Sequence, residues 1–432
     1  MGEASRMDGI RAAWEELDAI VEEIQGIPGY EDFLAVPTFD EVAETTRERP
    51  HCPLVYLAAA ESEGLALVVR GDEVTHVPLD SLTATELRER TTDHLARYTR
   101  YQRERTESPE AAGREWNAAL DEVTAWLWRE VMGPVLEAVD GEEELAVVAG
   151  GLLGLLPLHA AWTPDPGRAT GRRYVLDTVA VSYVPNARVL RTARQLAAQL
   201  APSRLLAVVD PWPTAAAPLR MARHEAAVAA AAFPASQKLL TRGEATFLSF
   251  EWEAPKADVW HLACHGFAAP TEPLESGLVL AGGPVRLRRL MEWRLRVRLA
   301  VLSACETAVP GTELPDEVVA LPTGLLQAGV AGVVASQWAV PDRATAMLMA
   351  EFYRQWLWLG QPPAAALRAA QRWLRDTTTA EKRTHFAAAL DEGADWLPAS
   401  AGQAFLDRLD LDPDGRAWAD IQQWGAFAHF GA

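Results

Sequence analysis

Lysine is nearly absent from this chain. Only Lys238, Lys256 and Lys382 occur among 432 residues, so arginine supplies almost all of the 40 basic side chains. The 60 acidic residues outnumber them and give a formal net charge of −20 at pH 7. Such a charge argues against nucleic acid or an anionic membrane surface as the main partner. The scarcity of lysine and the many alanines suggest a GC-rich, bacterial genome.

Cysteine is also scarce, and its spacing disfavours two common kinds of site. The three cysteines, Cys52, Cys264 and Cys305, are an odd number, and none forms a CxxC motif. A disulfide framework is therefore not expected, and a reducing cytoplasm is the predicted compartment. Residues 1–8 are polar and do not read as a secretory signal, which agrees with this prediction.

Long apolar runs and cofactor motifs are missing as well. The longest apolar stretch, residues 145–158, contains three glycines and one proline and is too short to span a bilayer, so no membrane partner is expected. No GxGxxG, P-loop or GxSxG motif occurs, and the sequence predicts no cofactor. Apolar residues nevertheless make up 49% of the chain, enough for a large buried core.

The chain is predicted to divide into three parts, at residues 49/50 and 202/203. Residues 1–49 contain an amphipathic helix and a linker. The helix either packs on its own domain or docks a partner, such as a regulatory protein or sensor. Its apolar side chains recur at helical spacing: Ile10, Trp14, Leu17, Val21 and Ile24.

Residues 50–202 are expected to form a smaller α/β subdomain, in which residues 174–184 alternate as one strand. Residues 203–432 alternate regularly between apolar strands and helices, and residues 277–281 count among the strands. Strands that are buried on both faces and separated by helices indicate a mostly parallel sheet covered by helices on both sides. The predicted fold class is therefore α/β.

Two apolar strands end on residues that can do chemistry together. Residues 258–264 lead into His265 and Gly266, and residues 299–304 lead into Cys305, 40 positions after His265. Adjacent parallel strands would bring both side chains to the same edge of the sheet. An imidazole can deprotonate a neighbouring thiol, and the thiolate attacks carbonyl carbons. The backbone N–H groups of Gly266 and Cys305 could then stabilise the oxyanion.

These motifs carry a family resemblance. The segments HLACHG (261–266) and LSACET (302–307), in this order after apolar strands, resemble the CHAT family of caspase-like cysteine peptidases, which is related to separase. Further segments resemble the family at residues 275–280, 325–330, 335–342 and 424–427. The resemblance implies a caspase-like catalytic subdomain at 203–432, with His265 as general base and Cys305 as nucleophile. It also implies that residues 50–202 form a non-catalytic, pseudo-caspase-like subdomain.

The resemblance further implies a biological role. It points to a cysteine endopeptidase that cleaves a specific protein partner under the control of a sensor, in bacterial antiviral defence or regulated cell death. Relatives usually carry a long helical-repeat region before the peptidase, whereas about fifty residues precede it here. Another chain could supply such a region. The alternative is a catalytically idle scaffold, although a scaffold has no need of both Cys305 and His265.

Three other interpretations of nearby residues are weaker. His261, Cys264 and His265 are spaced as H-x-x-C-H, but strand alternation puts Cys264 on the opposite side from the histidines, and no metal is predicted. The same alternation disfavours Cys264 as the nucleophile. His224 and Glu225 lack a second histidine four positions on, so we expect a pair on the surface of a helix.

A substrate pocket is predicted beside the strand that leads to Cys305. Asp342, 37 positions after Cys305, could pair with a basic side chain before the scissile bond. Alternatively, Asp342 caps the helix that follows it. Trp338 could instead form the wall of an apolar pocket.

Overall fold

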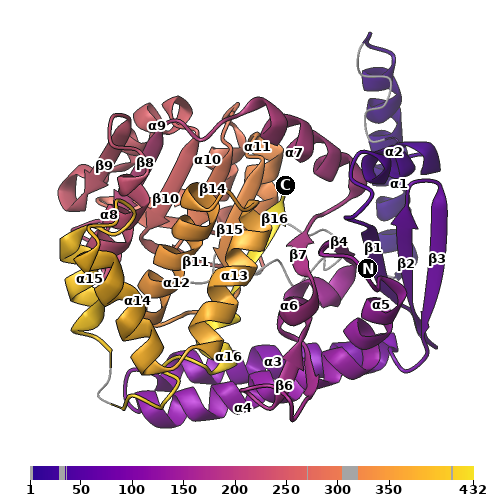
Figure 1. Ribbon diagram of the computed structural model, residues 1–432. Coiled ribbons are helices and arrows are strands. Elements are labelled where there is room, and N and C mark those ends of the chain that lie inside the picture. Colours follow the sequence, from indigo (N-terminus) through magenta and orange to yellow (C-terminus); the bar gives the residue numbers. More distant parts are fainter. Residues whose placement is uncertain (1–2, 29–34, 36, 270, 304–319, 410–411) are drawn as a thin grey trace. The chain divides into compact units, whose positions relative to one another are not determined.

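An eleven-stranded sheet organises the larger of two compact units, which comprise residues 1–42 and 43–432. The computed structural model describes residues 3–28, 35, 37–269, 271–303, 320–409 and 412–432 (Figure 1). The smaller unit contains helix α1 (Glu3–Gln25), which ends just before Gly26, the first of the residues expected to stop it. Helix α2 (Phe39–Arg47) begins at a capping box, in which Thr38 and Glu41 each accept a hydrogen bond from the other's backbone N–H.

The order of strands in the sheet is β3-β2-β1-β4-β7-β16-β15-β14-β10-β8-β9. Strands β1, β4 and β7 are parallel, and so are β8, β9, β10, β14 and β15. Strand β16 joins these two sets, because it pairs parallel with β7 and antiparallel with β15. The bounds are β1 Leu54–Ala59, β2 Gly64–Arg70, β3 Glu73–Leu79, β4 Glu144–Ala149, β7 Ala180–Tyr183, β8 Leu205–Val209, β9 Gln237–Thr241, β10 Val259–Ala263, β14 Leu299–Leu302, β15 Gly332–Ser336 and β16 Phe427–Gly431.

Helices cover both faces of the sheet, as predicted. One buried cluster joins Leu262 and Leu302 to Leu325 of α11, and the other joins Val301 and Val334 to α8, α12 and α13. The bounds are α3 Ala84–Glu104, α4 Pro109–Leu127, α5 Gly133–Ala138, α6 Val175–Thr178, α7 Ala187–Gln199, α8 Ala222–Ala231, α9 Phe247–Glu253, α10 Leu287–Met291, α11 Leu321–Ala328, α12 Asp342–Tyr353, α13 Pro363–Asp376, α14 Thr379–Asp391, α15 Ala399–Leu406 and α16 Ile421–Trp424.

Two expected strands differ from the structure. Residues 174–184 are not one strand: β6 (Arg172–Tyr174) pairs with β5 (Trp162–Pro164), and the turn of α6 separates it from β7. Asp177 causes this break, because its carboxylate accepts the N–H of Tyr174 at 2.9 Å. Residues 277–281 do form strand β12 (Gly277–Leu280), but it pairs antiparallel with β11 (His265–Phe267) and β13 (Gly283–Arg286), outside the main sheet.

A buried ion pair ties α6 to α13. The guanidinium of Arg375 lies 2.5 Å from the carboxylate of Asp177, and both side chains are almost completely buried. Arg368 donates to the carbonyl oxygens of Leu176, Asp177 and Thr178, which the short helix α6 leaves without helical partners. Helix α13 therefore holds the segment before β7 against the part of the sheet that contains β16.

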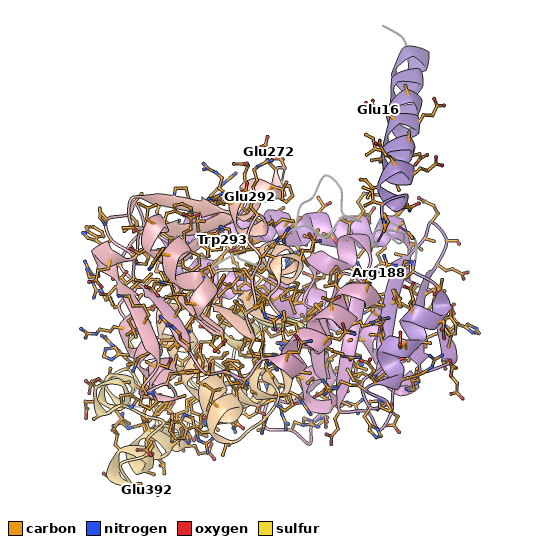
Figure 2. All side chains as sticks on the ribbon, turned by 90° about the horizontal axis from the view of Figure 1, so that it is seen from above. Glu16, Arg188, Glu272, Glu292, Trp293 and Glu392 are labelled. Carbon is orange, nitrogen blue, oxygen red and sulfur yellow. The ribbon has the colours of Figure 1, made fainter. Side chains whose placement is uncertain are left out.

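The main sheet continues across residue 202, and the division of the chain there remains a prediction. Glu272 and Glu392 are two of the acidic side chains that point outward in Figure 2. In the part of the chain that the structure describes, no helix combines the length and the apolar character needed to cross a membrane.

Candidate active site

His265 lies just beyond the carboxyl end of β10, as the first residue of β11. Its side chain is half-buried, and Nε2 lies 2.8 Å from the carbonyl oxygen of Ala217. Because a carbonyl oxygen only accepts hydrogen bonds, Nε2 carries the proton of this contact. In the neutral ring Nδ1 is then the basic nitrogen, so the contact with Ala217 fixes which nitrogen can take up a proton.

Cys305, the expected nucleophile, lies outside the described residues, which stop at Ser303 and resume at Ala320. The strand that leads toward it is described. Strand β14 is parallel to β10, and Val301 pairs with His261. In the sequence, Cys305 follows Val301 by four positions, just as His265 follows His261.

A small acidic cavity of about 30 Å³ lies where β10, β14 and β15 end. This volume is enough for about one water molecule. The oxygen-bearing side chains of its lining come from helices α8 and α12 and from the ends of strands β14 and β15. The lining consists of Leu219, Ala222, Glu225, Ala263, Cys264, Ser303, Ser336, Val340, Asp342, Thr345 and Phe427.

Glu225 of α8 is the most perturbed carboxyl group of this cavity. Its side chain is 2% exposed, and burial raises its pKa to about 8, with a further contribution from the charge of Asp342. The nearby hydroxyl of Ser303 opposes this shift. Glu225 therefore carries a proton at neutral pH. The expected surface pair of His224 and Glu225 is wrong, since both side chains are buried.

His261 lies beneath the same edge of the sheet and is completely buried. Its Nδ1 is 3.0 Å from the hydroxyl of Tyr353, and its Nε2 is 3.4 Å from Glu225. Burial lowers the pKa of His261 to about 3, so the imidazole is neutral. Cys264 is also buried and packs in the cluster on the other face of the sheet. Among the described residues, no group of three His, Cys, Asp or Glu side chains is arranged to bind a metal.

Asp342 begins α12 but does not cap it. Its carboxylate instead accepts the N–H of Met221 at 2.7 Å, just before the first residue of α8. Burial raises the pKa of Asp342, the N–H of Met221 lowers it, and the charge of His265 also lowers it. Asp342 is therefore close enough to His265 for the two groups to interact electrostatically.

Trp338 is buried in an aromatic cluster and does not line the acidic cavity. Its indole N–H donates to the carbonyl oxygen of Gln422, and its ring packs edge-on against Trp116 at a centroid distance of 6.0 Å. Only 1% of its surface is exposed. Gly266 lies in β11 opposite Leu278, and its contribution to an oxyanion hole remains a prediction.

The CHAT domain model matches residues 121–432, which is well over half of the sequence. The chain belongs to the CHAT domain family. No curated protein matches this CHAT domain protein. A chain of the Saccharomyces cerevisiae separase–securin complex, solved twice, is similar in structure, with TM-scores of 0.55 and 0.57 and 9% sequence identity.

These matches cover 90% of the CHAT domain protein but only 30% and 31% of the yeast chain. At this identity they show the fold alone, which is the expected caspase-like α/β fold of cysteine peptidases. The Arg-specific cysteine proteinase gingipain R from Porphyromonas gingivalis also matches, at 10% identity, over 73% of this chain and 67% of its own, with a TM-score of 0.38.

The sequence pattern did carry a signal for Glu225, which sequence reasoning missed. Glu225 is the one acidic residue within residues 222–231, a helix otherwise composed mainly of alanine. Small side chains on every face of a helix indicate close packing all round, so a carboxylate in that helix is expected to be buried.

Glu225 predicts a specific pH dependence of stability. An ordinary glutamate has a pKa of 4.5, and burial raises that of Glu225 to about 8. Between these values the folded chain holds a proton that the unfolded chain has lost, so the free energy of unfolding falls as pH rises through this window. Glu225→Gln cannot ionise and should remove this dependence. Relative to the parent, we expect it to gain on the order of a few kcal/mol between pH 5 and pH 8.

Urea unfolding at pH 5, 6.5 and 8 measures this gain. The exposed residue Glu392 provides the control, because Glu392→Gln should change stability little at any of these pH values. If the stabilities of the parent and of Glu225→Gln run parallel across the range, Glu225 does not hold the proton.

Proposed function

We propose that this CHAT domain protein is a cysteine endopeptidase with Cys305 as nucleophile and His265 as the group that moves the proton. The observation that carries the proposal is the pairing of His261 with Val301 in adjacent parallel strands. Because His265 and Cys305 each follow their paired residue by four positions in the sequence, the proposal puts both at the same edge of the sheet. Membership of a family with a caspase-like peptidase fold supports the same chemistry.

In the proposed reaction the two nitrogens of the His265 ring have different roles. Nε2 is engaged by the carbonyl oxygen of Ala217, so Nδ1 is the nitrogen that takes the thiol proton of Cys305. The thiolate then attacks the scissile carbonyl, and the backbone N–H groups of Gly266 and Cys305 stabilise the oxyanion. His265 next donates its proton to the leaving amine, and water hydrolyses the acyl-enzyme with His265 as base.

The dyad predicts both loss of activity and selective labelling. Cys305→Ala should lower kcat/KM by about 1,000-fold or more, since no other group supplies the nucleophile. Iodoacetamide should label Cys305 before Cys52 or Cys264, which are buried. Peptide mapping by mass spectrometry measures the order of labelling.

Cys52→Ala is the matched control and should keep its activity, because Cys52 lies far from β10 along the sheet. Full cleavage by Cys305→Ala would refute the dyad. Binding of a protein partner without any cleavage by the parent would favour a scaffold.

The proposed substrate pocket rests on Asp342. Its carboxylate lies at the edge of the sheet that bears His265 and interacts with that histidine. A partly buried carboxylate there can pair with an Arg or Lys side chain just before the scissile bond. Trp338 is too deeply buried to contact a substrate, so we keep Asp342 alone in the proposed pocket.

A peptide library cut by the active enzyme tests this pocket. We expect Arg and Lys to be enriched before the cut, and Asp342→Asn should reduce that preference about tenfold or more. Glu351→Gln, a buried carboxylate on the same helix but outside the cavity, is the control. A preference that survives Asp342→Asn would mean that Asp342 serves only to hold the start of α8 through Met221.

We also propose that a partner controls the enzyme through the N-terminal segment. Trp14, Leu17 and Ile20 of α1 are exposed, as expected for a docking helix. A specific protein substrate, a bacterial cytoplasm and a role in antiviral defence or cell death are proposed from family resemblance alone.

Control through α1 predicts that the purified chain cleaves fluorescent casein only slowly, because the active conformation is weakly populated without the partner. Rapid constitutive cleavage would contradict it.

A further inference from the structure

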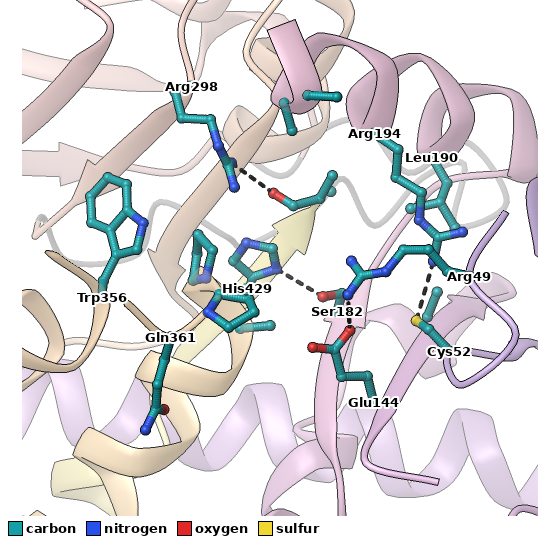
Figure 3. Close-up of a pocket in the computed structure, with 18 of the residues that line it drawn as sticks. Arg49, Cys52, Glu144, Ser182, Leu190, Arg194, Arg298, Trp356, Gln361 and His429 are labelled. Atoms are coloured by element: carbon teal, nitrogen blue, oxygen red, sulfur yellow. Dashed lines mark hydrogen bonds and ion pairs between the residues drawn. The ribbon is translucent and has the colours of Figure 1, made fainter. Parts of the chain in front are cut away.

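A large cavity lies where β7 and β16 meet, away from His265. Its volume is about 510 Å³, within the range of sites for small organic molecules. Strands β7 and β16 pair at only two positions, Ser182 with His429 and Tyr183 with Phe430. The pairing that joins the two sets of strands is therefore short at this point. Helix α7 and the segment before α13 complete the walls. Figure 3 shows the side chains that point into this space.

Three arginines gather around this cavity in a chain that is otherwise strongly acidic. Arg49, Arg194 and Arg298 line it, with Glu144 as the acidic side chain of the lining. Arg49 and Glu144 form an ion pair at 2.8 Å. The three arginines outnumber Glu144 and the terminal carboxylate of Ala432, which also belongs to the lining, by one positive charge.

Neither Arg194 nor Arg298 has a carboxylate side chain as its hydrogen-bond partner. Arg194, 9% exposed, donates to the carbonyl oxygen of Thr45 at 2.6 Å and to Sγ of Cys52 at 3.2 Å. Arg298 donates at 3.1 Å to an oxygen of Ala432, the residue that bears the terminal carboxylate of this sequence. Within the described residues, no carboxylate side chain lies within ion-pair distance of either guanidinium. Burial lowers the pKa of both arginines, and the charge of Arg49 lowers each of them further.

His429 adds an unsatisfied polar atom to the same place. The side chain is 1% exposed, and Nδ1 lies 2.9 Å from the hydroxyl of Ser182. Nε2 has no hydrogen-bond partner. Burial and the charge of Arg298 lower the pKa of His429 to about 3, so the ring is neutral. A buried polar atom without a partner costs stability, and a bound anion that accepts a hydrogen bond from it would relieve that cost.

The remaining wall is apolar. Trp356, Pro362, Pro363 and Leu190 belong to the lining, and Gln361 is the polar side chain among them. Indole and proline rings of this kind pack against flat organic groups. The cavity therefore combines a cationic part, suited to phosphate, with an apolar part.

We propose that this cavity binds a small phosphate-bearing organic anion, with Arg194, Arg298 and Arg49 on the phosphate and Trp356 against the organic part. Guanidinium groups bind phosphate oxygens in pairs, which suits Arg194 and Arg298, since no carboxylate side chain pairs with either of them. This site is separate from the proposed dyad and does not depend on it.

Isothermal titration calorimetry on the full chain tests the proposal, with Cys305→Ala as the background to prevent self-cleavage. The probes are inorganic pyrophosphate and ADP at 150 mM NaCl. We expect saturable binding of both, with a Kd for ADP of about 100 μM or lower and weaker binding of pyrophosphate. Arg298→Gln and Arg194→Gln should each weaken ADP binding tenfold or more.

Arg294→Gln is the matched control, since Arg294 is exposed and lies outside the cavity. It removes the same charge and should leave the Kd unchanged. Thermal unfolding separates a binding role from a structural one: ADP should raise the Tm of the parent and of Arg294→Gln, and should raise that of Arg298→Gln less.

Three results would overturn the proposal. One is the absence of saturable binding of either probe up to about 10 mM, which is far above a specific affinity. Another is an equal loss of affinity in Arg294→Gln and Arg298→Gln, which would indicate non-specific attraction. The third is binding of pyrophosphate without ADP, which would refute an organic ligand.

Discussion

Strand β16 is the constraint on which the remaining architecture depends. It is the one strand that pairs with both sets of parallel strands in the described sheet, antiparallel with β15 and parallel with β7. Its contact with β7 is short, and other groups reinforce it. Gln371 of α13 donates to the carbonyl oxygens of Trp424 and Phe427, at the start of the strand. The buried pair of Arg375 and Asp177 anchors the same helix to the segment before β7.

The acidic cavity at the ends of β10, β14 and β15 is less charged than its composition suggests. Glu225 is protonated and His261 is neutral, because burial penalises the charged form of each group. Asp342 is the carboxyl group of this set that a backbone N–H and His265 help to ionise. The cavity therefore places one negative charge, that of Asp342, close to His265.

Local periodicity predicted most of the fold. The alternation of strands and helices after residue 203 and the placement of His265 beyond β10 follow from short apolar runs and their spacing. Local periodicity failed to predict the structure where contacts between distant parts of the sequence override the local pattern. Residues 174–184 alternate, yet Asp177 turns the chain to meet Arg375, which lies 198 residues away in the sequence. Similarly, β12 has the composition of a core strand but pairs with β11 outside the main sheet.

The two sites differed in how far the sequence could reveal them. His265 and Cys305 belong to compact motifs, so pattern alone suggested the dyad. Glu225 could be found only by asking what surrounds an Ala-rich helix. The arginine-lined cavity brings together Arg49, Arg194 and Arg298 from distant parts of the chain, and each arginine alone resembles an ordinary surface residue. Only the folded chain shows that they share one space.

The position of β16 late in the sequence affects how the protein is made. Strand β7 is complete at residue 183 and β15 at residue 336, but the strand that covers both begins at residue 427. At ~5–20 residues per second, the ribosome completes β7 roughly 12–50 seconds before it reaches the partner strand β16. An open strand edge can pair with another chain. Each nascent chain therefore exposes two such edges during synthesis, and the arrival of its final strand ends this period of vulnerability.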